Sequence, residues 1–359
     1  MKLLYTTSII YPSTLANRIQ ILQMAKELNN QLGFDNFVLS GKSIVLKDNN
    51  INLKNINGSS RSFIFSIKCL ILAKKEKIKY IFCREEKLLF FIVLYNKLFF
   101  HLKVVFIYEA HEIREKKCFW CSYMLKNVNK IIVLTSFIKD TFIKKFNVDE
   151  NKILVASDAV DLEKFNVEIS KENARKNVNL SPDKKIVMYT GHLYDWKGVQ
   201  ILADANRFLK KNVVVVFVGG KSNDLKKFKL KNSKYKNILI LGQKPYKEIP
   251  FYLKSADVLI LPNSGKKKIS KYYTSPMKMF EYMASNVPIV ASNLPSIMEI
   301  LNNSNALLVK ADNSKKLSEG INKILEDDVL GSKISKQAYE DVKKYTWKKR
   351  VENILEFIK

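Results

Sequence analysis

The sequence predicts an α/β protein built from two doubly wound parallel sheets, because short apolar runs alternate with longer helical patterns along nearly the whole chain. The same alternation occurs twice, once in each half. Neither a GxGxxG segment nor a P-loop follows a predicted strand, so a dinucleotide dehydrogenase or an NTPase lacks its usual support. We therefore expect two domains of similar architecture.

The strands expected in the first half are 3–7, 36–40, 80–83, 104–108, 130–135 and 153–156, and those expected in the second half are 185–190, 213–218, 237–241, 258–262, 288–292 and 306–309. Hydrophobic periodicity is lost between the halves, where Asn, Lys and Glu gather before a Ser-Pro-Asp turn. The domain boundaries that follow are a first domain at 1–164, a linker at 165–184, a second domain at 185–340 and a terminal helix at 341–359.

The composition is that of a globular protein with room for two cores, at 359 residues and 47% hydrophobic content. A formal net charge of +28 favours polyanionic partners, although a surface that merely tolerates lysine would look the same. Four cysteines are too few for a disulfide framework, which fits a reducing cytoplasm. Without a second ligand pair, we interpret the CxxC of Cys118 and Cys121 as chance spacing.

The segment SPMKMFEYMA combines a helix start with an unusually placed carboxylate. Ser275 is expected to cap the helix and Pro276 to take its first position. One apolar stripe is formed by Met277, Phe280 and Ala284. Glu281 then lies on another face, where it could accept hydrogen bonds from a ribose diol while the helix amides hold a diphosphate. The alternative is a solvated carboxylate paired with Lys278.

A second segment, GHLYDWKGV, follows the strand expected at 185–190. Gly191 permits a tight turn there. Lys197, with Gly198, stands at the start of the next helix, where a cation opposes the helix dipole unless an anion lies between them. Lys197 is thus a candidate diphosphate clamp, or else a surface lysine whose stem covers apolar area.

Together these segments resemble the retaining glycosyltransferases of family 4, whose two Rossmann-like domains face a cleft in the GT-B fold. The resemblance implies that a donor site is formed by Gly191, His192, Lys197, Ser275, Pro276, Met277, Lys278 and Glu281. His192 replaces an arginine found in many members, and Tyr273 replaces a frequent glutamate, which leaves the donor sugar open.

The first half contributes one further candidate after the strand at 104–108. There, Tyr108, Glu109, Ala110 and His111 resemble the family's YE-x-H element, which implies a catalytic role for His111 beside Lys197. Taken alone, a single histidine is more often structural.

Acceptor contacts are predicted from position only. Ser13, Asn17 and Arg18 follow the first strand, and Arg84 follows the strand at 80–83. For Arg84, a surface ion pair with Glu85 or Glu86 is an equal alternative.

Two segments predict either contact with an anionic membrane or burial in the core. They are the apolar block 88–100, flanked by lysines, and the aromatic stretch 116–126. No apolar run is long enough to span a bilayer, so the chain is expected to be cytoplasmic, with peripheral contact at the inner membrane face.

The resemblance implies a retaining hexosyl transfer from a UDP- or GDP-type sugar to a lipid-linked or saccharide acceptor, in cell-surface polysaccharide or glycolipid assembly. It implies no metal and no cofactor, and no nucleic-acid partner is expected. The alternatives are a nucleotide-sugar epimerase of similar fold and a non-catalytic protein that binds polyanions or membranes.

Overall fold

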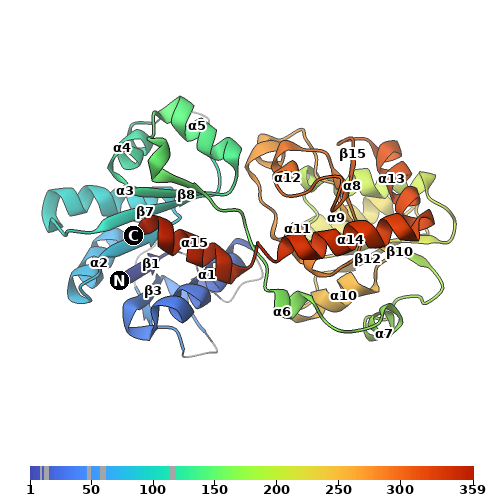
Figure 1. The fold of residues 1–359 in the computed structure, drawn as a ribbon, viewed down its shortest axis with the longest axis horizontal. Coiled ribbons are helices and arrows are strands. Elements are labelled where there is room, and N and C mark those ends of the chain that lie inside the picture. The colour runs from blue at the N-terminus through green and yellow to red at the C-terminus, as the bar shows by residue number, and fades with distance from the viewer. Residues whose placement is uncertain (9, 12–15, 47–49, 57–61, 114–117) are drawn as a thin grey trace. The chain divides into compact units, whose positions relative to one another are not determined.

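The computed structural model describes residues 1–8, 10–11, 16–46, 50–56, 62–113 and 118–359 of the chain. Contacts divide the chain into a first unit, residues 1–158 with 347–359, and a second unit, residues 159–346 (Figure 1). Each unit is built around one parallel sheet, which confirms the predicted fold class.

The first unit has a seven-stranded sheet in the order β5-β3-β1-β6-β7-β8-β9 and a small parallel pair, β2 with β4. Its strands are β1 (Leu3–Thr6), β2 (Ile10–Tyr11), β3 (Phe37–Gly41), β4 (Ser43–Ile44), β5 (Leu53–Asn55), β6 (Tyr80–Cys83), β7 (Val105–Ala110), β8 (Lys130–Val133) and β9 (Ile153–Val155). Its α-helices are α1 (Ala16–Leu32), α2 (Ser62–Lys75), α3 (Glu86–Tyr95), α4 (Phe119–Asn127), α5 (Ser136–Phe146) and α15 (Trp347–Ile358).

The second unit has a six-stranded sheet in the order β12-β11-β10-β13-β14-β15. Its strands are β10 (Lys185–Thr190), β11 (Val213–Val218), β12 (Ile238–Gly242), β13 (Val258–Leu261), β14 (Ile289–Ser292) and β15 (Leu307–Val309). Its α-helices are α6 (Leu162–Phe165), α7 (Lys171–Asn177), α8 (Val199–Ala205), α9 (Ser222–Asn232), α10 (Ile249–Ser255), α11 (Met277–Ala284), α12 (Pro295–Met298), α13 (Ser314–Glu326) and α14 (Asp328–Val342).

Every strand expected from the sequence is present, within about two residues at each end. Strand β5 and the β2–β4 pair were not expected. They are short, and β5 is a partly polar strand at the sheet edge, so hydrophobic patterning does not mark them.

Strand β10 shows why the second sheet is apolar on both faces. Ile186 and Met188 pack into a core that includes α11, whereas Val187 and Tyr189 pack into the opposite core with α8 and α13. Because successive side chains of a strand point to opposite faces, a strand buried on both sides reads as a continuous apolar run.

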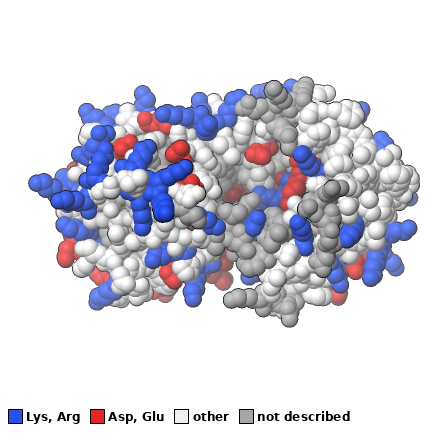
Figure 2. All heavy atoms as spheres, turned by 180° about the vertical axis from the view of Figure 1, so that it is seen from behind, with Lys and Arg blue, Asp and Glu red and all other residues white. Residues whose placement is uncertain are grey.

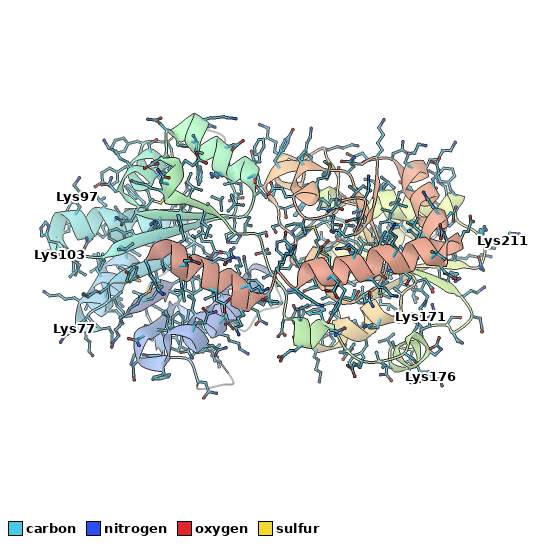
Figure 3. The ribbon with its side chains drawn as sticks, in the orientation of Figure 1. Lys77, Lys97, Lys103, Lys171, Lys176 and Lys211 are labelled. Carbon is cyan, nitrogen blue, oxygen red and sulfur yellow. A yellow bond between two sulfur atoms is a disulfide. The ribbon has the colours of Figure 1, made fainter. Side chains whose placement is uncertain are left out.

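Positive charge is distributed over the surface. Figure 2 shows Lys and Arg side chains spread across the visible face, and Figure 3 labels lysines in both units, among them Lys97 and Lys211. No helix among the described residues is long and apolar enough to cross a membrane.

The cysteines at the start of α4 correct a prediction. Cys118, at the N-cap of α4, and Cys121, in its first turn, are joined by a disulfide, so their spacing is not chance. Positions three apart at a helix start lie on the same face, which brings the two sulfur atoms together. Cys69 and Cys83 are free and buried.

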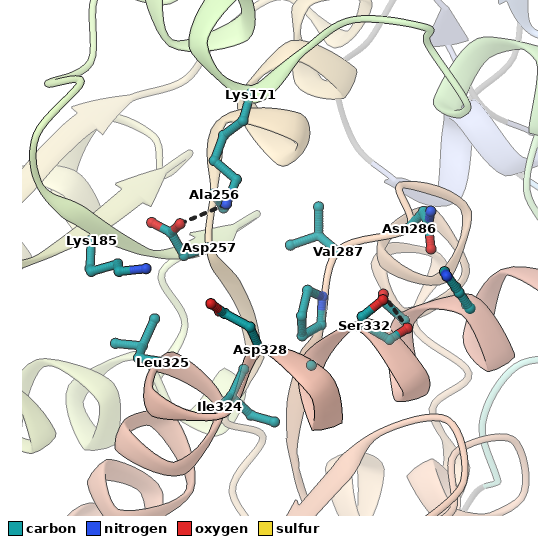
Figure 4. A pocket seen from close by; sticks show the side chains of 14 residues that line it. Lys171, Lys185, Ala256, Asp257, Asn286, Val287, Ile324, Leu325, Asp328 and Ser332 are labelled. Carbon is teal, nitrogen blue, oxygen red and sulfur yellow. Dashed lines mark hydrogen bonds and ion pairs between the residues drawn. The ribbon is translucent and has the colours of Figure 1, made fainter.

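The segment expected as a linker, 165–184, is instead packed on the second unit. The Arg175 guanidinium of α7 donates to the Ser255 carbonyl at 3.0 Å and pairs with the Asp257 carboxylate at 2.6 Å. Lys171 pairs with the other oxygen of Asp257 at 2.8 Å, and both residues line a pocket (Figure 4). Lys185, at the start of β10, also lines this pocket, which therefore lies at the amino ends of the strands.

The last two helices lie in different units. Helix α14 belongs to the second unit, and α15 packs against α1 in the first unit. The terminal helix begins at Trp347 and not at residue 341. The apolar positions expected to form its buried stripe are all buried: Trp347, Val351, Ile354, Leu355 and Ile358.

Replacing Asp257 by Ala should lower the free energy of unfolding by about 3 kcal/mol, because the buried Arg175 would lose its countercharge. Urea denaturation measures the change. The matched control is Lys171→Met, which removes the half-exposed partner and should cost less than about 1 kcal/mol. Equal losses in the two variants would contradict this assignment.

Candidate active site

The candidate donor site lies at the carboxyl ends of the second sheet, where the strand order reverses. Strand β10 pairs with β11 on one side and β13 on the other, and ligands of open α/β sheets bind at such a switch point. Gly191 follows β10 at φ +121° and donates its N–H to the Val218 carbonyl at 2.8 Å. The loop after β10 is thereby anchored to the end of β11.

Gly198 fixes the other end of this loop. Its φ is +71°, and a Cβ at this position would lie 1.7 Å from the Pro262 carbonyl oxygen. Only glycine fits so close to the chain after β13. Lys197, the last residue of a 3₁₀ turn directly before α8, is therefore held at the switch point, with its Nζ 4.2 Å from the Trp196 ring centroid.

His192 is half-buried and stacks on the Tyr194 ring, with 5.0 Å between centroids. Burial lowers the pKa of His192, and the charges of Lys197, Lys221 and Lys278 lower it further. The imidazole is therefore neutral at pH 7 and contributes hydrogen bonding and not charge.

Helix α11 begins one residue later than predicted. Pro276 occupies the N-cap position and makes no side-chain capping bond, so the prediction that Ser275 is the N-cap residue is wrong. All eight residues of α11 are buried, including Glu281 on the face away from the apolar stripe. Helix α11 packs against α14, and the side chains on its polar face contact other elements: Lys278 lies on the Tyr189 ring, Glu281 accepts from Tyr246, and Tyr282 accepts from Thr190.

Glu281 is buried at 7% exposure and accepts a hydrogen bond from the Tyr246 hydroxyl at 2.8 Å. Burial raises its pKa, while the Tyr246 bond and the charge of Lys278 act in the opposite direction. The alternative of a solvated pair with Lys278 is therefore wrong. Tyr246, which positions Glu281, was not predicted, and its 3₁₀ turn gives no motif by which to find it.

Lys278 is the most unusual group of the site. Its side chain is buried, and its Nζ has no hydrogen-bond partner among the described residues. It lies 3.7 Å from the Tyr189 ring centroid. Such a contact is worth roughly 0.5 to 2 kcal/mol, less than the several kcal/mol needed to bury a charge. Burial, and then the charge of Lys197, hold the pKa of Lys278 well below its usual value, although Glu281 acts to raise it.

In the first unit, His111 lies beside a buried ion pair. Arg350 of α15 donates to Glu109 Oε1 at 2.7 Å, and His111 Nε2 lies 3.5 Å from the same oxygen. Arg350 also donates to the Ser157 carbonyl at 2.9 Å. Arg350 was missed, although its position between Trp347 and the next apolar residues of α15 places it on the buried stripe.

The buried charges set the protonation of this cluster. Although burial acts to raise it, Arg350 and His111 hold the pKa of Glu109 well below its usual range. Burial and the charge of Arg84 lower the pKa of His111 to about 4. Burial raises the pKa of Asp158 to about 7. His111 is therefore neutral at physiological pH.

The residues predicted to contact the acceptor lie in different parts of the first unit. Ser13 lies outside the described residues, Asn17 belongs to α1, and Arg18 is partly exposed on the same helix. Arg84 donates to Gln20 Oε1 at 2.8 Å, and Gln20 donates to Asp158, so Arg84 belongs to the buried cluster. None of these contacts tests acceptor binding.

The second unit thus brings together the predicted donor residues, and the first unit holds His111 and Arg84. Among the described residues, no group of three or more His, Cys, Asp or Glu side chains is placed to hold a metal ion.

Comparisons with known proteins agree with this picture. Residues 170–341 match the sequence profile of a family described as Glycosyl transferases group 1. The chain is 26% identical over 237 residues to UDP-Gal:alpha-D-GlcNAc-diphosphoundecaprenol alpha-1,3-galactosyltransferase of Escherichia coli, covering 63% of this chain and 57% of that protein. It is 30% identical over 210 residues to N,N'-diacetylbacillosaminyl-diphospho-undecaprenol alpha-1,3-N-acetylgalactosaminyltransferase of Campylobacter jejuni, covering 57% and 53%. The chain spans about half the length of the curated relatives that it matches.

The structure resembles that of Anabaena HepE in complex with UDP, with a TM-score of 0.82 and 16% identity over 99% of each chain. The HepE complex with UDP-glucose gives a TM-score of 0.79 at 17% identity, over 99% of this chain and 98% of that one. The chain therefore has the GT-B fold, and the sequence matches support a glycosyltransferase.

The opposite pKa shifts of His111 and Asp158 predict a pH dependence of folding stability that becomes measurable only when one of the two groups is removed. Between about pH 4 and 6.5, the unfolded chain protonates His111 and not Asp158, whereas the folded chain does the reverse, so the proton counts cancel. In Asp158→Asn only the histidine remains. Because the folded-state pKa of His111 is lowered, the free energy of unfolding of this variant decreases as pH falls through this window, by at most about 3 kcal/mol.

Urea denaturation of Asp158→Asn at a series of pH values measures this slope, and adding His111→Gln should flatten it again. A slope in Asp158→Asn equal to that of the unaltered protein would show that the two groups are not shifted as described.

Proposed function

We propose that this protein is a glycosyltransferase that moves a sugar from a nucleotide diphosphate-sugar to a lipid-linked or saccharide acceptor, with retention at the anomeric carbon. One observation carries the proposal: Lys197, Lys278 and the buried carboxyl of Glu281 gather at the switch point of the unit that matches Glycosyl transferases group 1. Two amines and a hydrogen-bonding carboxyl suit the two parts of a nucleotide diphosphate.

The proposed donor contacts follow from the geometry. Lys197 and the amides at the start of α11 would stabilise the charge that develops on the leaving diphosphate. Glu281, with Oε1 held by Tyr246, would present its second oxygen to the ribose hydroxyls. His111, neutral in its buried cluster, would take part in transfer as a hydrogen-bonding group.

Two comparisons support the proposed substrates. The Escherichia coli and Campylobacter jejuni relatives are named for diphosphoundecaprenol-linked acceptors, and HepE was solved with UDP and UDP-glucose. We therefore propose a UDP-type hexose donor and an acceptor carried on a lipid diphosphate, in the assembly of a surface glycan. We also propose that positive side chains neutralise the leaving group without a metal.

Lys197→Met should lower kcat about 10²- to 10³-fold, because one stabilising contact to the leaving group is lost.

Glu281→Gln should raise KM for the donor about tenfold. The glutamine can still accept a hydrogen bond from Tyr246, but the second carboxylate oxygen, which would accept from the ribose, is replaced by an amide NH₂. Activity is measured as sugar transfer from a donor chosen by thermal-shift screening of UDP and GDP sugars. EDTA should change the rate by less than about twofold.

The control is Lys211→Met, which removes an exposed lysine at the edge of the second unit and should keep full activity (Figure 3). Full activity of both site variants would exclude this donor site. Conversion of the donor sugar without any acceptor would instead favour an epimerase, and the anomeric configuration of the product decides retention.

We further propose that the first unit touches an anionic membrane through the ends of α3 and α4. The middle of the block 88–100 is core, since Leu88 and Ile92 are buried, but Phe99 is 70% exposed on the π-helical turn Asn96–Phe100. Phe119, at the start of α4, is 84% exposed. Lys97 flanks this aromatic surface, and helices with exposed aromatic and basic side chains bind headgroup layers.

Replacing Phe99 and Phe119 by Ser together should reduce sedimentation with phosphatidylglycerol vesicles about tenfold, because two large apolar side chains no longer enter the lipid. The control is Leu230→Ser, an equally exposed apolar residue of α9 in the second unit, which should sediment normally. Unchanged sedimentation of the double variant would exclude this surface.

A further inference from the structure

The Lys278 side chain is enclosed by protein and points at the loop after β10. A Cβ at Gly191 would lie 2.8 Å from Lys278 Nζ, so the glycine is what admits the amine to the loop. The side chain is 8% exposed and Nζ has no hydrogen-bond partner among the described residues. A buried amine without a hydrogen-bond partner destabilises the folded chain, and a ligand that accepts its hydrogen bonds would remove this destabilisation.

Among the described residues, no neighbouring group forms an ion pair or a hydrogen bond with the Lys278 amine. Tyr189 presents its ring, and its hydroxyl donates to the His192 carbonyl at 2.6 Å. Lys197 carries the same sign of charge, and His192 is neutral. Glu281, one turn along α11, is the acidic group that acts on Lys278, and its own pKa is raised by burial. The Tyr282 hydroxyl accepts from the Thr190 N–H at 2.8 Å and is neutral.

A ligand that completes this site must therefore be an anion. It must lie against the backbone of Gly191, within reach of Lys278 and close to Lys197. On the proposed function, on which this inference rests, that anion is the diphosphate of the donor.

We propose that Lys278 is uncharged while the site is empty and takes up a proton from the buffer when the diphosphate binds. The amine then becomes an ammonium that donates to phosphate oxygens, and donor binding is coupled to the uptake of one proton. The site thus avoids holding two unpaired cations, Lys278 and Lys197, side by side in the free protein. The same proton is released when the nucleotide leaves.

The sign of the pH effect follows from linkage. A group that is protonated in the complex and not in the free protein makes the affinity fall as pH rises, by up to tenfold in Kd per pH unit. Burial and Lys197 lower the pKa of free Lys278, and a bound diphosphate would raise it, so the pH window of the coupling begins below 10.5. The pKa of His192 is lowered below 6.5 by burial and by the neighbouring lysines, so His192 is neutral in the free protein between about pH 7.5 and 9. The nucleotide phosphate, with a second pKa of about 6, is ionised there.

The test is isothermal titration calorimetry of UDP, and of GDP, between about pH 7.5 and 9. Buffers with different ionisation enthalpies, such as HEPES and Tris, report the number of protons exchanged. The unaltered protein should take up close to one proton, and its Kd should rise with pH. Lys278→Arg, which is charged at every pH, should bind without proton uptake and with a flat pH dependence. Lys211→Met is the matched control and should behave as the unaltered protein.

The outcomes distinguish the proton uptake by Lys278 from the proposed glycosyltransferase function. Nucleotide binding with no net proton uptake, or equal uptake in the unaltered protein and Lys278→Arg, would overturn the role of Lys278 while leaving the donor site in place. Absence of binding by either nucleotide, together with absence of transfer, would overturn the proposed function itself. Lys278→Met should bind weakly and without proton uptake. If that variant does not fold, the comparison with Lys278→Arg still decides.

Discussion

The approach of Gly198 to the Pro262 carbonyl is the constraint on which the second unit's site depends. A side chain at position 198 would separate the loop after β10 from the chain after β13, because its first carbon would lie 1.7 Å from the oxygen. The parallel pairing of β10 with β13 brings the two segments to the same sheet edge, and the glycine lets them touch. Lys197 is positioned as a result, one residue before that contact.

Most buried charged groups described above are paired, such as Arg350 with Glu109 and Arg175 with Asp257, and Lys278 is the exception among them. In the first unit, Glu109 is matched by Arg350, and the pair ties β7 to the terminal helix and to the segment that leaves the unit. A buried ion is stable when its partner and remaining hydrogen bonds are present. In the second unit, Lys278 has no such partner among the described residues. A satisfied pair stabilises the fold, whereas we propose that the unsatisfied amine at the switch point pairs with a ligand.

Hydrophobic patterning predicted most of the fold and part of the site. The apolar runs that became β10 and β11 are buried on both sides, and the stripe of α15 is buried as spaced. Patterning failed where tertiary contacts override local preference. Helix α11 has no exposed face, because Tyr189, Tyr246 and Thr190 contact its polar side chains, and α7 is docked by the ion pair of Arg175 with Asp257 instead of forming a linker.

The sequence by itself determined the two parallel sheets, the glycines that permit the loop after β10, and the identities of Lys197, Lys278 and Glu281. These follow from period, backbone freedom and residue chemistry, which are local properties of the chain. Only the tertiary structure decided that Glu281 is held by Tyr246, that Lys278 is enclosed against Tyr189, and that Arg350 reaches Glu109. Those contacts join residues that are 35, 89 and 241 positions apart. Burial and partner charge, which set protonation, exist only once the elements have packed.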